Sequence, residues 1–196
     1  MKITAKNISK SFKKKVLFKD LSFEINKGDK VCITADSGKG KSTVLKILLG
    51  LETFQNGSIL IDGKELNSEN IQEIRKNIAW LPQDLSINIE QGFELIELLK
   101  IDKKLFISYL KQLGITESLL NQNFQSLSGG QKQRLLLASC LSLEKPLLFV
   151  DEPTSALDKN AISLLIKTIW KKKNITLISA SHNKGWIDAC SLIIKL

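Results

Sequence analysis

Several features that would place this chain of 196 residues in a membrane, in a secretory pathway or among metal-binding proteins are missing. The longest apolar runs, such as 147–150, are far too short to cross a bilayer. The first residues, Met-Lys-Ile-Thr-Ala-Lys-Asn, lack the apolar core of a signal peptide, so we expect a protein that stays in the cytoplasm. Cys32, Cys140 and Cys190 have no metal-ligand spacing, which indicates reduced core residues.

Arginine is also scarce, since only Arg75 and Arg134 occur among the 29 Lys and Arg residues. The net charge of +9 raises the question of nucleic-acid binding. The lysines are nevertheless scattered, with short runs at 13–15 and 171–173 and no basic stripe interleaved with aromatics. A lysine-rich surface, or proximity to an anionic membrane, therefore fits the charge better than a nucleic-acid partner does.

The remaining composition, with 43% hydrophobic and 25% charged residues, is that of a soluble globular protein. Short apolar strands alternate with helical stretches, which predicts an α/β fold with a mostly parallel sheet covered on both faces. Residues 2–8, 16–18 and 21–25 precede that pattern and are expected to form short β-strands. Residues 92–121 carry apolar side chains at helical spacing and predict a small helical insertion.

The most informative segment is Ala-Asp-Ser-Gly-Lys-Gly-Lys-Ser-Thr at 35–43, directly after the apolar run 31–34. A strand, a glycine-rich turn and a helix that opens with Lys-Ser-Thr are the parts of a phosphate-binding loop. Gly38 and Gly40 have no Cβ, so the backbone can approach an anion closely. The ordinary alternative is a Ser/Gly loop that leads into an amphipathic helix.

Three side chains of this loop have separate consequences. Lys41 can reach the β- and γ-phosphates of a nucleotide, and the Ser42 hydroxyl can bind Mg²⁺. Ala35 stands where the usual pattern has its first glycine. It must keep a negative φ or accept strain, and strain would reduce phosphate affinity.

Two carboxylates, Asp151 and Glu152, follow the apolar run 147–150. A buried parallel strand would deliver them to the carboxyl end of the sheet, where sites in open α/β sheets lie. Asp151 is suited to hold Mg²⁺, and Glu152 can polarise a water for attack on the γ-phosphate. Alone, such a pair is often only a strand end followed by a helix cap, but the upstream phosphate-binding loop makes the catalytic interpretation stronger.

A second phosphate-type element is Leu-Ser-Gly-Gly-Gln at 127–131. Ser128 can cap the following helix, while Gly129 and Gly130 leave its first amides open. The common alternative is a simple capped helix start. A nucleotide held by loop 35–43 leaves no evident room for a second helix terminus of the same chain, so we assign this element to a nucleotide bound by another copy.

With these segments in place, the chain resembles the ATP-binding subunits of ABC transporters over essentially its whole length. Residues 35–43 match the Walker A motif of that family except at Ala35, and residues 127–131 match its signature motif. Residues 147–152 match the Walker B motif with its catalytic glutamate. Their common order favours the resemblance over the separate alternatives.

Further positions extend the resemblance. Gln83 follows a predicted strand and matches the Q-loop glutamine, and Ser-Ala-Leu-Asp at 155–158 matches the D-loop. His182 is the only histidine and matches the switch histidine after a strand. Phe12 lies where the family places an aromatic that stacks on adenine. Singly, a lone glutamine is usually a solvated surface residue, and a lone histidine is more often structural.

The resemblance implies a P-loop NTPase of the ABC ATPase type, with a mixed sheet core, an N-terminal antiparallel β subdomain and a small inserted α-helical subdomain. Residues 1–196 are expected to form one nucleotide-binding domain, with 84–127 as the inserted helical lobe. No C-terminal regulatory domain is expected, because the chain ends soon after the strand that follows His182.

The resemblance also implies an ATPase that uses ATP and Mg²⁺ at the inner face of the cell membrane. It would power transport through separate integral membrane permease subunits. A homodimer or heterodimer would sandwich each ATP between one chain's Walker A loop and the other chain's signature, closing with ATP and opening on hydrolysis. Leu85, Ile87 and Ile89 have no obvious internal helix to pack against, so we expect them to line a groove for a permease helix. The alternative is that they pack on the core of their own lobe.

The residues implied by the resemblance form three groups. Catalysis is assigned to Glu152, His182, Lys41 and Gln83. Mg²⁺ is assigned to Ser42, Gln83 and Asp151. Nucleotide binding is assigned to Phe12, Ser37, Gly38, Lys39, Gly40, Lys41, Ser42, Thr43, Ser128, Gly129, Gly130, Gln131 and Asp158.

Two other functions remain open at this stage. A soluble ABC-type ATPase of DNA repair would carry a long coiled coil in place of residues 92–121, and a translation factor would usually carry two ATPase domains. A regulatory module that barely hydrolyses ATP is mildly favoured by Ala35, whereas Glu152 and His182 argue against it.

Overall fold

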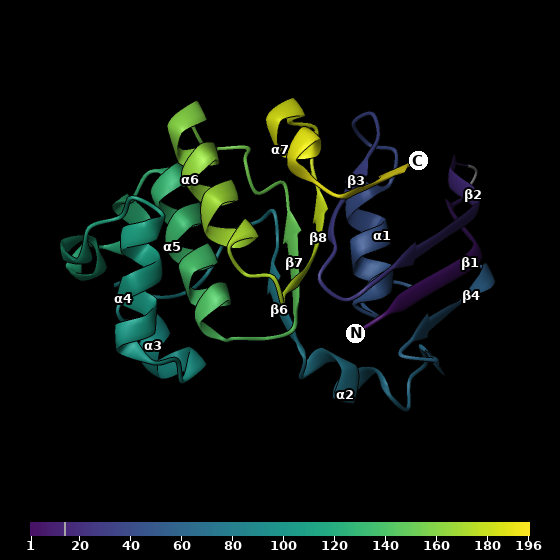
Figure 1. The fold of residues 1–196 in the computed structure, drawn as a ribbon, viewed down its shortest axis with the longest axis horizontal. Coiled ribbons are helices and arrows are strands. Elements are labelled where there is room, and N and C mark those ends of the chain that lie inside the picture. Colours follow the sequence, from purple (N-terminus) through teal and green to yellow (C-terminus); the bar gives the residue numbers. More distant parts are fainter. Residues whose placement is uncertain (14) are drawn as a thin grey trace.

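The structure is a computed structural model that describes residues 1–13 and 15–196, so Lys14 of the lysine run lies outside it. The chain forms two sheets and seven α-helices within the described residues (Figure 1). The strands are β1 (Ile3–Phe12), β2 (Lys15–Ile25), β3 (Lys30–Thr34), β4 (Asn56–Ile61), β5 (Lys64–Glu65), β6 (Ile78–Leu81), β7 (Leu147–Asp151), β8 (Thr176–Ala180) and β9 (Leu192–Lys195). The helices are α1 (Lys41–Leu48), α2 (Ile71–Arg75), α3 (Glu94–Leu99), α4 (Lys103–Gln112), α5 (Gly129–Ser142), α6 (Lys159–Trp170) and α7 (Lys184–Ala189), with 3₁₀ turns at Glu117–Asn121 and Phe124–Ser126.

The central sheet has the order β6-β7-β8-β3-β9, and every neighbouring pair in it is parallel. Strands β7 and β8 are buried at every position, as expected for parallel strands that are covered on both faces. The α/β prediction is therefore confirmed. The predicted mixed sheet differs from the structure in one respect, because the parallel and the antiparallel strand pairs lie in two separate sheets.

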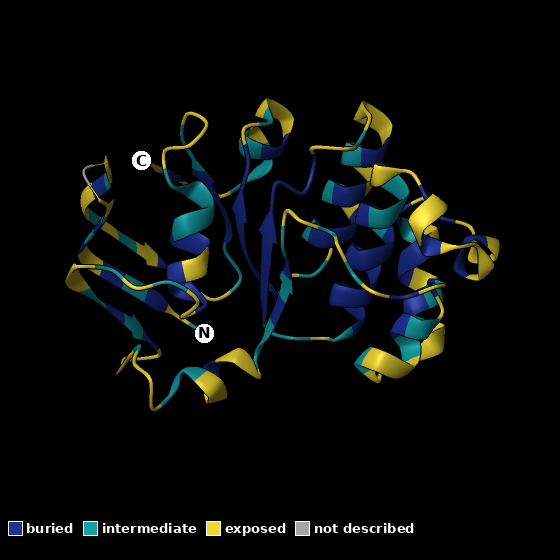
Figure 2. Ribbon diagram, turned by 180° about the vertical axis from the view of Figure 1, so that it is seen from behind, coloured by how far each residue is buried: buried dark blue, intermediate teal, exposed yellow. Residues whose placement is uncertain are grey.

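Alternate residues of β7 face two different apolar clusters. Leu147 and Phe149 pack with α1 and the antiparallel sheet, whereas Leu148 and Val150 pack with α5 and α6. Figure 1 shows α1 between the two sheets, with α5 and α6 on the opposite side of the parallel sheet. Figure 2 shows that burial is concentrated in these inner layers. This two-sided packing holds the carboxyl ends of the central strands in place.

The second sheet is antiparallel, with the order β2-β1-β4-β5. The two short strands expected at 16–18 and 21–25 are one strand, β2, whose pairing with β1 contains register shifts. Asp20, between them, has a φ of 52°. The interrupted apolar pattern therefore marks an irregularity within a strand rather than its end.

Residues 92–121, between β6 and α5, are largely helical, as the spacing predicts, whereas residues 82–91 form no helix. The apolar pattern of 92–121 is divided between α3 and α4, because Lys100 adopts a left-handed conformation and Asp102 begins the second helix. The Asp102 side chain accepts a hydrogen bond from the Leu105 N–H at 2.7 Å. Phe106 and Leu110 of α4 belong to the same buried cluster as Leu135 of α5.

The structure also bears on the expectations for membrane-spanning segments and for the three cysteines. No helix in the described ranges has the length and apolar character that a membrane span needs. Cys32 and Cys140 are buried, Cys190 is partly buried, and all three are free thiols. Burial raises the pKa of the Cys140 thiol to about 12, which fits an unreactive core residue.

Candidate functional site

The phosphate-binding loop connects the carboxyl end of β3 to the amino end of α1. Its backbone turns through left-handed conformations at Gly38 (φ 72°) and Gly40 (φ 102°). In the described chain no side chain caps α1, so its first amides remain available to an anion. Ala35 does not have a positive φ, so the alanine introduces no left-handed strain at the start of the loop.

Lys41 lies between the loop and the carboxylates of β7. Its Nζ donates to the Ala35 carbonyl at 3.2 Å and lies 3.9 Å from Glu152 Oε1. Both side chains of this ion pair are largely buried, at 10% exposure each. The ammonium is therefore held beside the phosphate loop and the predicted general base at once.

The three predicted Mg²⁺ ligands come together around one cavity. Ser42, Gln83 and Asp151 line a hollow of about 450 Å³, together with other residues that include Lys46 and Trp80. Asp151 is only 3% exposed, and its Oδ1 has no hydrogen bond within the described chain. Burial raises the pKa of this carboxyl group, and the Ser42 hydroxyl opposes the rise.

This oxygen set fits a hard cation. A buried carboxylate oxygen without a partner, beside a hydroxyl and an amide, is the kind of environment that Mg²⁺ accepts. The described residues form no group of three or more His, Cys, Asp or Glu side chains that could hold a metal. An ion here would thus depend on the hydroxyl and amide oxygens as well as on Asp151.

Glu152 and His182 are adjacent at the ends of β7 and β8. His182 Nδ1 lies 3.0 Å from Glu152 Oε2, although no donor in the described chain is aligned on that oxygen as a hydrogen bond. The histidine is 72% exposed, whereas the glutamate side chain is 10% exposed. The histidine is therefore accessible to a ligand, whereas the glutamate is largely buried.

The signature segment forms the start of α5. Ser128 Oγ accepts from the Gln131 N–H at 3.3 Å, and the Gln131 side chain accepts from the Ser128 N–H at 2.9 Å, which completes a capping box. A Cβ on Gly130 would lie 2.6 Å from the Ala156 carbonyl, so only glycine fits against the D-loop there. Asp158 caps α6 by accepting from the Ala161 N–H at 2.8 Å.

Phe12 lies at the end of β1 and is 46% exposed. The Lys10 Nζ lies 4.6 Å from the centre of its ring, at cation–π distance. Across the hairpin, Lys15 pairs with Phe12, and its Nζ donates to the Gly38 carbonyl at 3.2 Å. Phe12 is therefore the strand partner of a residue that contacts the phosphate-binding loop.

The predicted site residues differ in their contacts with loop 35–43. Loop 35–43, Gln83, Asp151, Glu152 and His182 lie at the carboxyl ends of parallel strands. Within the described ranges no hydrogen bond or ion pair joins residues 128–131 to loop 35–43. The signature therefore makes no direct polar contact with the phosphate-binding loop, and its assignment to a nucleotide on another copy stays a prediction.

Two contacts were not expected from the sequence. Gln133 Nε2 donates to the Glu152 carbonyl at 2.8 Å, and Lys15 contacts the phosphate loop as described above. The only sequence signal for Gln133 is a polar residue on the inward face of α5, where leucines dominate. Lys15 carries no such signal, because it is one of many surface lysines.

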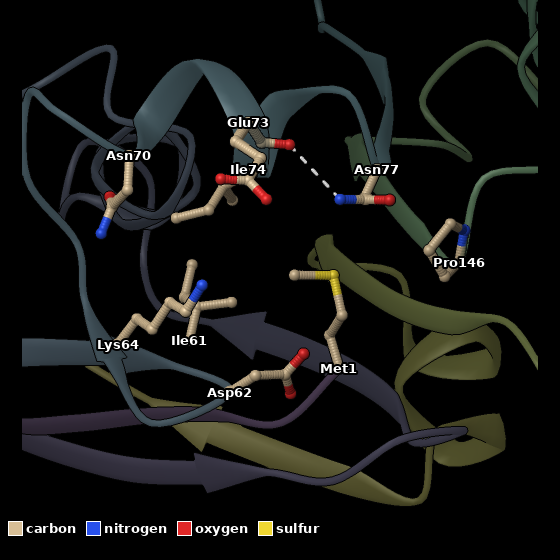
Figure 3. A pocket seen from close by; sticks show the side chains of 9 residues that line it. All are labelled: Met1, Ile61, Asp62, Lys64, Asn70, Glu73, Ile74, Asn77 and Pro146. Atoms are coloured by element: carbon tan, nitrogen blue, oxygen red, sulfur yellow. Dashed lines mark hydrogen bonds between the residues drawn. The ribbon is translucent and has the colours of Figure 1, made fainter.

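A separate cavity of about 280 Å³ lies between the antiparallel sheet and α2, and Figure 3 shows the side chains that line it. It is lined by Met1, Ile61, Asp62, Lys64, Asn70, Glu73, Ile74, Asn77 and Pro146. None of the predicted site residues is among them. This hollow is therefore distinct from the nucleotide site.

Comparisons with known proteins agree with this geometry. The family model described as "ABC transporter" matches residues 18–155. The methionine import ATP-binding protein MetN of Clostridioides difficile is 37% identical over 195 residues, which cover 92% of this chain and 60% of that protein. The energy-coupling factor transporter ATP-binding protein EcfA1 of Mycoplasma pneumoniae is 38% identical over 198 residues, covering 95% of this chain and 72% of that protein.

Solved structures show the same similarity. An ATP-binding cassette solved as a dimer in a post-hydrolysis state with ADP and Pi has a TM-score of 0.83 and 27% identity, covering 99% of this chain and 94% of that one. The chain spans only about two thirds or less, 60% and 65%, of the two MetN proteins that it matches.

Proposed function

The chain belongs to the ABC transporter family, and we propose that it binds and hydrolyses ATP to drive transport through separate integral membrane permease subunits. The observation that carries the proposal is the convergence of Lys41, Asp151 and Glu152 on the uncapped amino end of α1. A phosphate-binding loop alone would bind a nucleotide. A buried carboxylate beside its lysine adds a group that can activate water.

In the proposed mechanism, the first amides of α1 and the Lys41 ammonium bind the β- and γ-phosphates. Mg²⁺, for which Ser42, Gln83 and Asp151 offer oxygens, would neutralise phosphate charge when bound. Glu152 orients a water in line with the γ-phosphate and withdraws its proton. His182, 3.0 Å from that carboxylate, holds the water and the γ-phosphate in register.

We propose further that the working unit is a homodimer or heterodimer. Ser128, Gly129 and Gly130 of one chain would close over the ATP held by the loop of the other, with Phe12 stacked on the adenine. Hydrolysis would remove the γ-phosphate contacts and open the pair. The lack of any hydrogen bond or ion pair between residues 128–131 and loop 35–43, within the described ranges, is compatible with this arrangement.

The permeases would hold the protein at the inner face of the membrane. The segment after Gln83 offers a docking region, because Leu85 and Ile87 are partly buried around a cavity of about 230 Å³ between β6, α3 and α5. Apolar side chains at the rim of a hollow suit a short amphipathic helix of a partner. The Q-loop glutamine beside it links this region to the Mg²⁺ cavity.

The test is Mg²⁺-dependent ATPase activity of the purified protein and of Lys41→Ala. We expect turnover to fall by about a hundredfold or more, because the variant lacks the cation beside the γ-phosphate. Removal of Mg²⁺ with EDTA should abolish activity in the parent. Lys167→Ala, on the exposed face of α6, is the matched control and should keep full turnover. Equal turnover in Lys41→Ala and the parent would contradict the proposal.

A further inference from the structure

Gln133 connects the signature helix to the predicted general base of the same chain. It lies in the second turn of α5, close to the capping box of Ser128 and Gln131, and is 4% exposed. Its Nε2 donates to the backbone carbonyl of Glu152 at 2.8 Å. Movement of the first turns of α5 would therefore reach the backbone of Glu152 directly.

The backbone of Glu152 is held in an unusual conformation. Its φ is 49°, in the left-handed region that residues with a Cβ adopt at a cost. Its N–H donates to the Ala180 carbonyl at 2.8 Å, and its carbonyl accepts from the Ser155 N–H at 3.2 Å and the Ser155 hydroxyl at 3.1 Å. Such a conformation persists only where its surroundings hold it, and Gln133 supplies the contact that comes from α5.

The oxygen of the same Gln133 side-chain amide has no partner within the described chain. This atom, Oε1, is buried. A buried amide with an unused acceptor costs stability compared with an apolar side chain of the same length. Folding alone therefore does not account for a glutamine here, whereas the bond to Glu152 does.

From this geometry we infer that Gln133 is a positioning residue that couples the signature segment to Glu152. The inference rests on the proposed function, in which residues 128–131 engage the nucleotide of the partner copy. When that nucleotide binds, the start of α5 is fixed, Gln133 fixes the Glu152 backbone, and the carboxylate of the chain's own site is aligned. One site of the dimer thus prepares the other for hydrolysis.

The test is Gln133→Met, which keeps side-chain length but removes both the donor and the unpaired acceptor. The Glu152 carbonyl still has its two bonds from Ser155, so we expect an unchanged or higher Tm and unchanged ATP affinity of the monomer. The kcat should fall about tenfold with little change in KM, as for the loss of one aligned hydrogen bond. Gln72→Met, at an exposed position on α2, is the matched control.

A second background separates positioning from a merely structural role. If Gln133 acts through Glu152, adding Gln133→Met to Glu152→Gln should leave the residual turnover unchanged. A further tenfold fall in that background overturns the inference, as does an unchanged kcat in the single variant. A Gln133→Met protein with a lowered Tm and weakened ATP binding would make the residue structural, which also overturns it.

Hydrogen exchange gives a readout that needs no ATPase activity. The Glu152 N–H, which is bonded to Ala180, should exchange several-fold faster in Gln133→Met, because the residue loses one of its restraints. An unchanged exchange rate would overturn the inference even if the parent hydrolysed ATP. If instead the parent showed no turnover at all while exchange rose in the variant, the proposed function would fail and the coupling contact would stand.

Discussion

Ala35 illustrates how a departure from a motif can be accommodated at a single residue. Glycine is needed in such loops where φ is positive, and the positive values fall at Gly38 and Gly40 instead. The Ala35 carbonyl accepts a hydrogen bond from the Lys41 ammonium, and the alanine methyl takes no part in this contact. The alanine therefore gives less support to a regulatory module that barely hydrolyses ATP.

Glu152→Gln is the prediction that belongs to this scale. The amide keeps the shape of the carboxylate but cannot withdraw a proton, so we expect ATP binding to persist while turnover falls by about 10²–10⁴-fold. The protein should then accumulate as an ATP-bound dimer, which light scattering and retained nucleotide would measure. Glu144→Gln, at an exposed position after α5, serves as the control. A monomer at saturating ATP would count against the dimer.

At the scale of elements, α1 and α5 begin in opposite ways. The start of α1 has no side-chain cap in the described chain, whereas α5 carries a complete capping box. The first amides of α1 are thus available to a ligand. The capping box satisfies one N–H of α5 and fixes the direction in which its remaining amides point. The start of α1 can therefore bind an anion on its own. The start of α5 instead presents a rigid surface on which one backbone N–H is already bonded.

The segment after β6 shows where an expectation was wrong. Ile89 is 7% exposed and belongs to the buried cluster, so it does not line a groove. Leu85 and Ile87 line the cavity of about 230 Å³, but they are partly buried and pack against the same apolar cluster as Ile89. The difference arises because Ile89 enters the core shared by α4 and α5, which its sequence neighbours do not reveal.

We expect Leu85→Glu or Ile87→Glu to leave folding and basal ATPase activity largely intact but to abolish recovery with membranes. A charge at the rim stays hydrated in the free protein and opposes an apolar partner helix. Sedimentation with membrane vesicles measures the loss, and Ser86→Glu, exposed between them, is the control. Ile89→Glu should instead unfold the protein. Variants that fold and still sediment would show that the permease docks elsewhere.

At the scale of the whole molecule, the predicted nucleotide-binding residues are distributed over two sheets and one helix. The antiparallel sheet carries Phe12, the parallel sheet carries loop 35–43 and the carboxylates, and α5 carries the signature. Shared apolar clusters on both faces of the parallel sheet join these parts. We propose that a second copy completes the site, and complementation tests that proposal.

Ser128→Arg should block hydrolysis but leave ATP binding to the monomer intact, because its bulk and charge enter the partner's site. Lys41→Ala and Ser128→Arg should each be inactive alone. When mixed, they should regain activity, up to roughly a quarter of the parent's, since half of random dimers keep one intact site of two and that site lacks the preparation that the second site would supply. The ATPase rate of the mixture measures this. A mixture as inactive as its components would contradict the action of Ser128 on the partner's nucleotide, unless the two sites must fire together.

Local chemistry let the sequence alone determine much of this protein. The turn at 35–43, the capping of α5 by Ser128 and the alternation of strands and helices depend on neighbouring residues, and the structure agrees with these features. The order of motifs also pointed to the family that the comparisons show. The roles of the site residues stay predictions.

Only the tertiary structure decided how distant segments meet. It separated the two sheets, gathered Ser42, Gln83 and Asp151 around one cavity, and joined Gln133 to Glu152. It also set the left-handed backbone of Glu152, which no local pattern requires of a glutamate. These features depend on how helices pack across the sheet, and such packing follows from the whole core rather than from any run of neighbours.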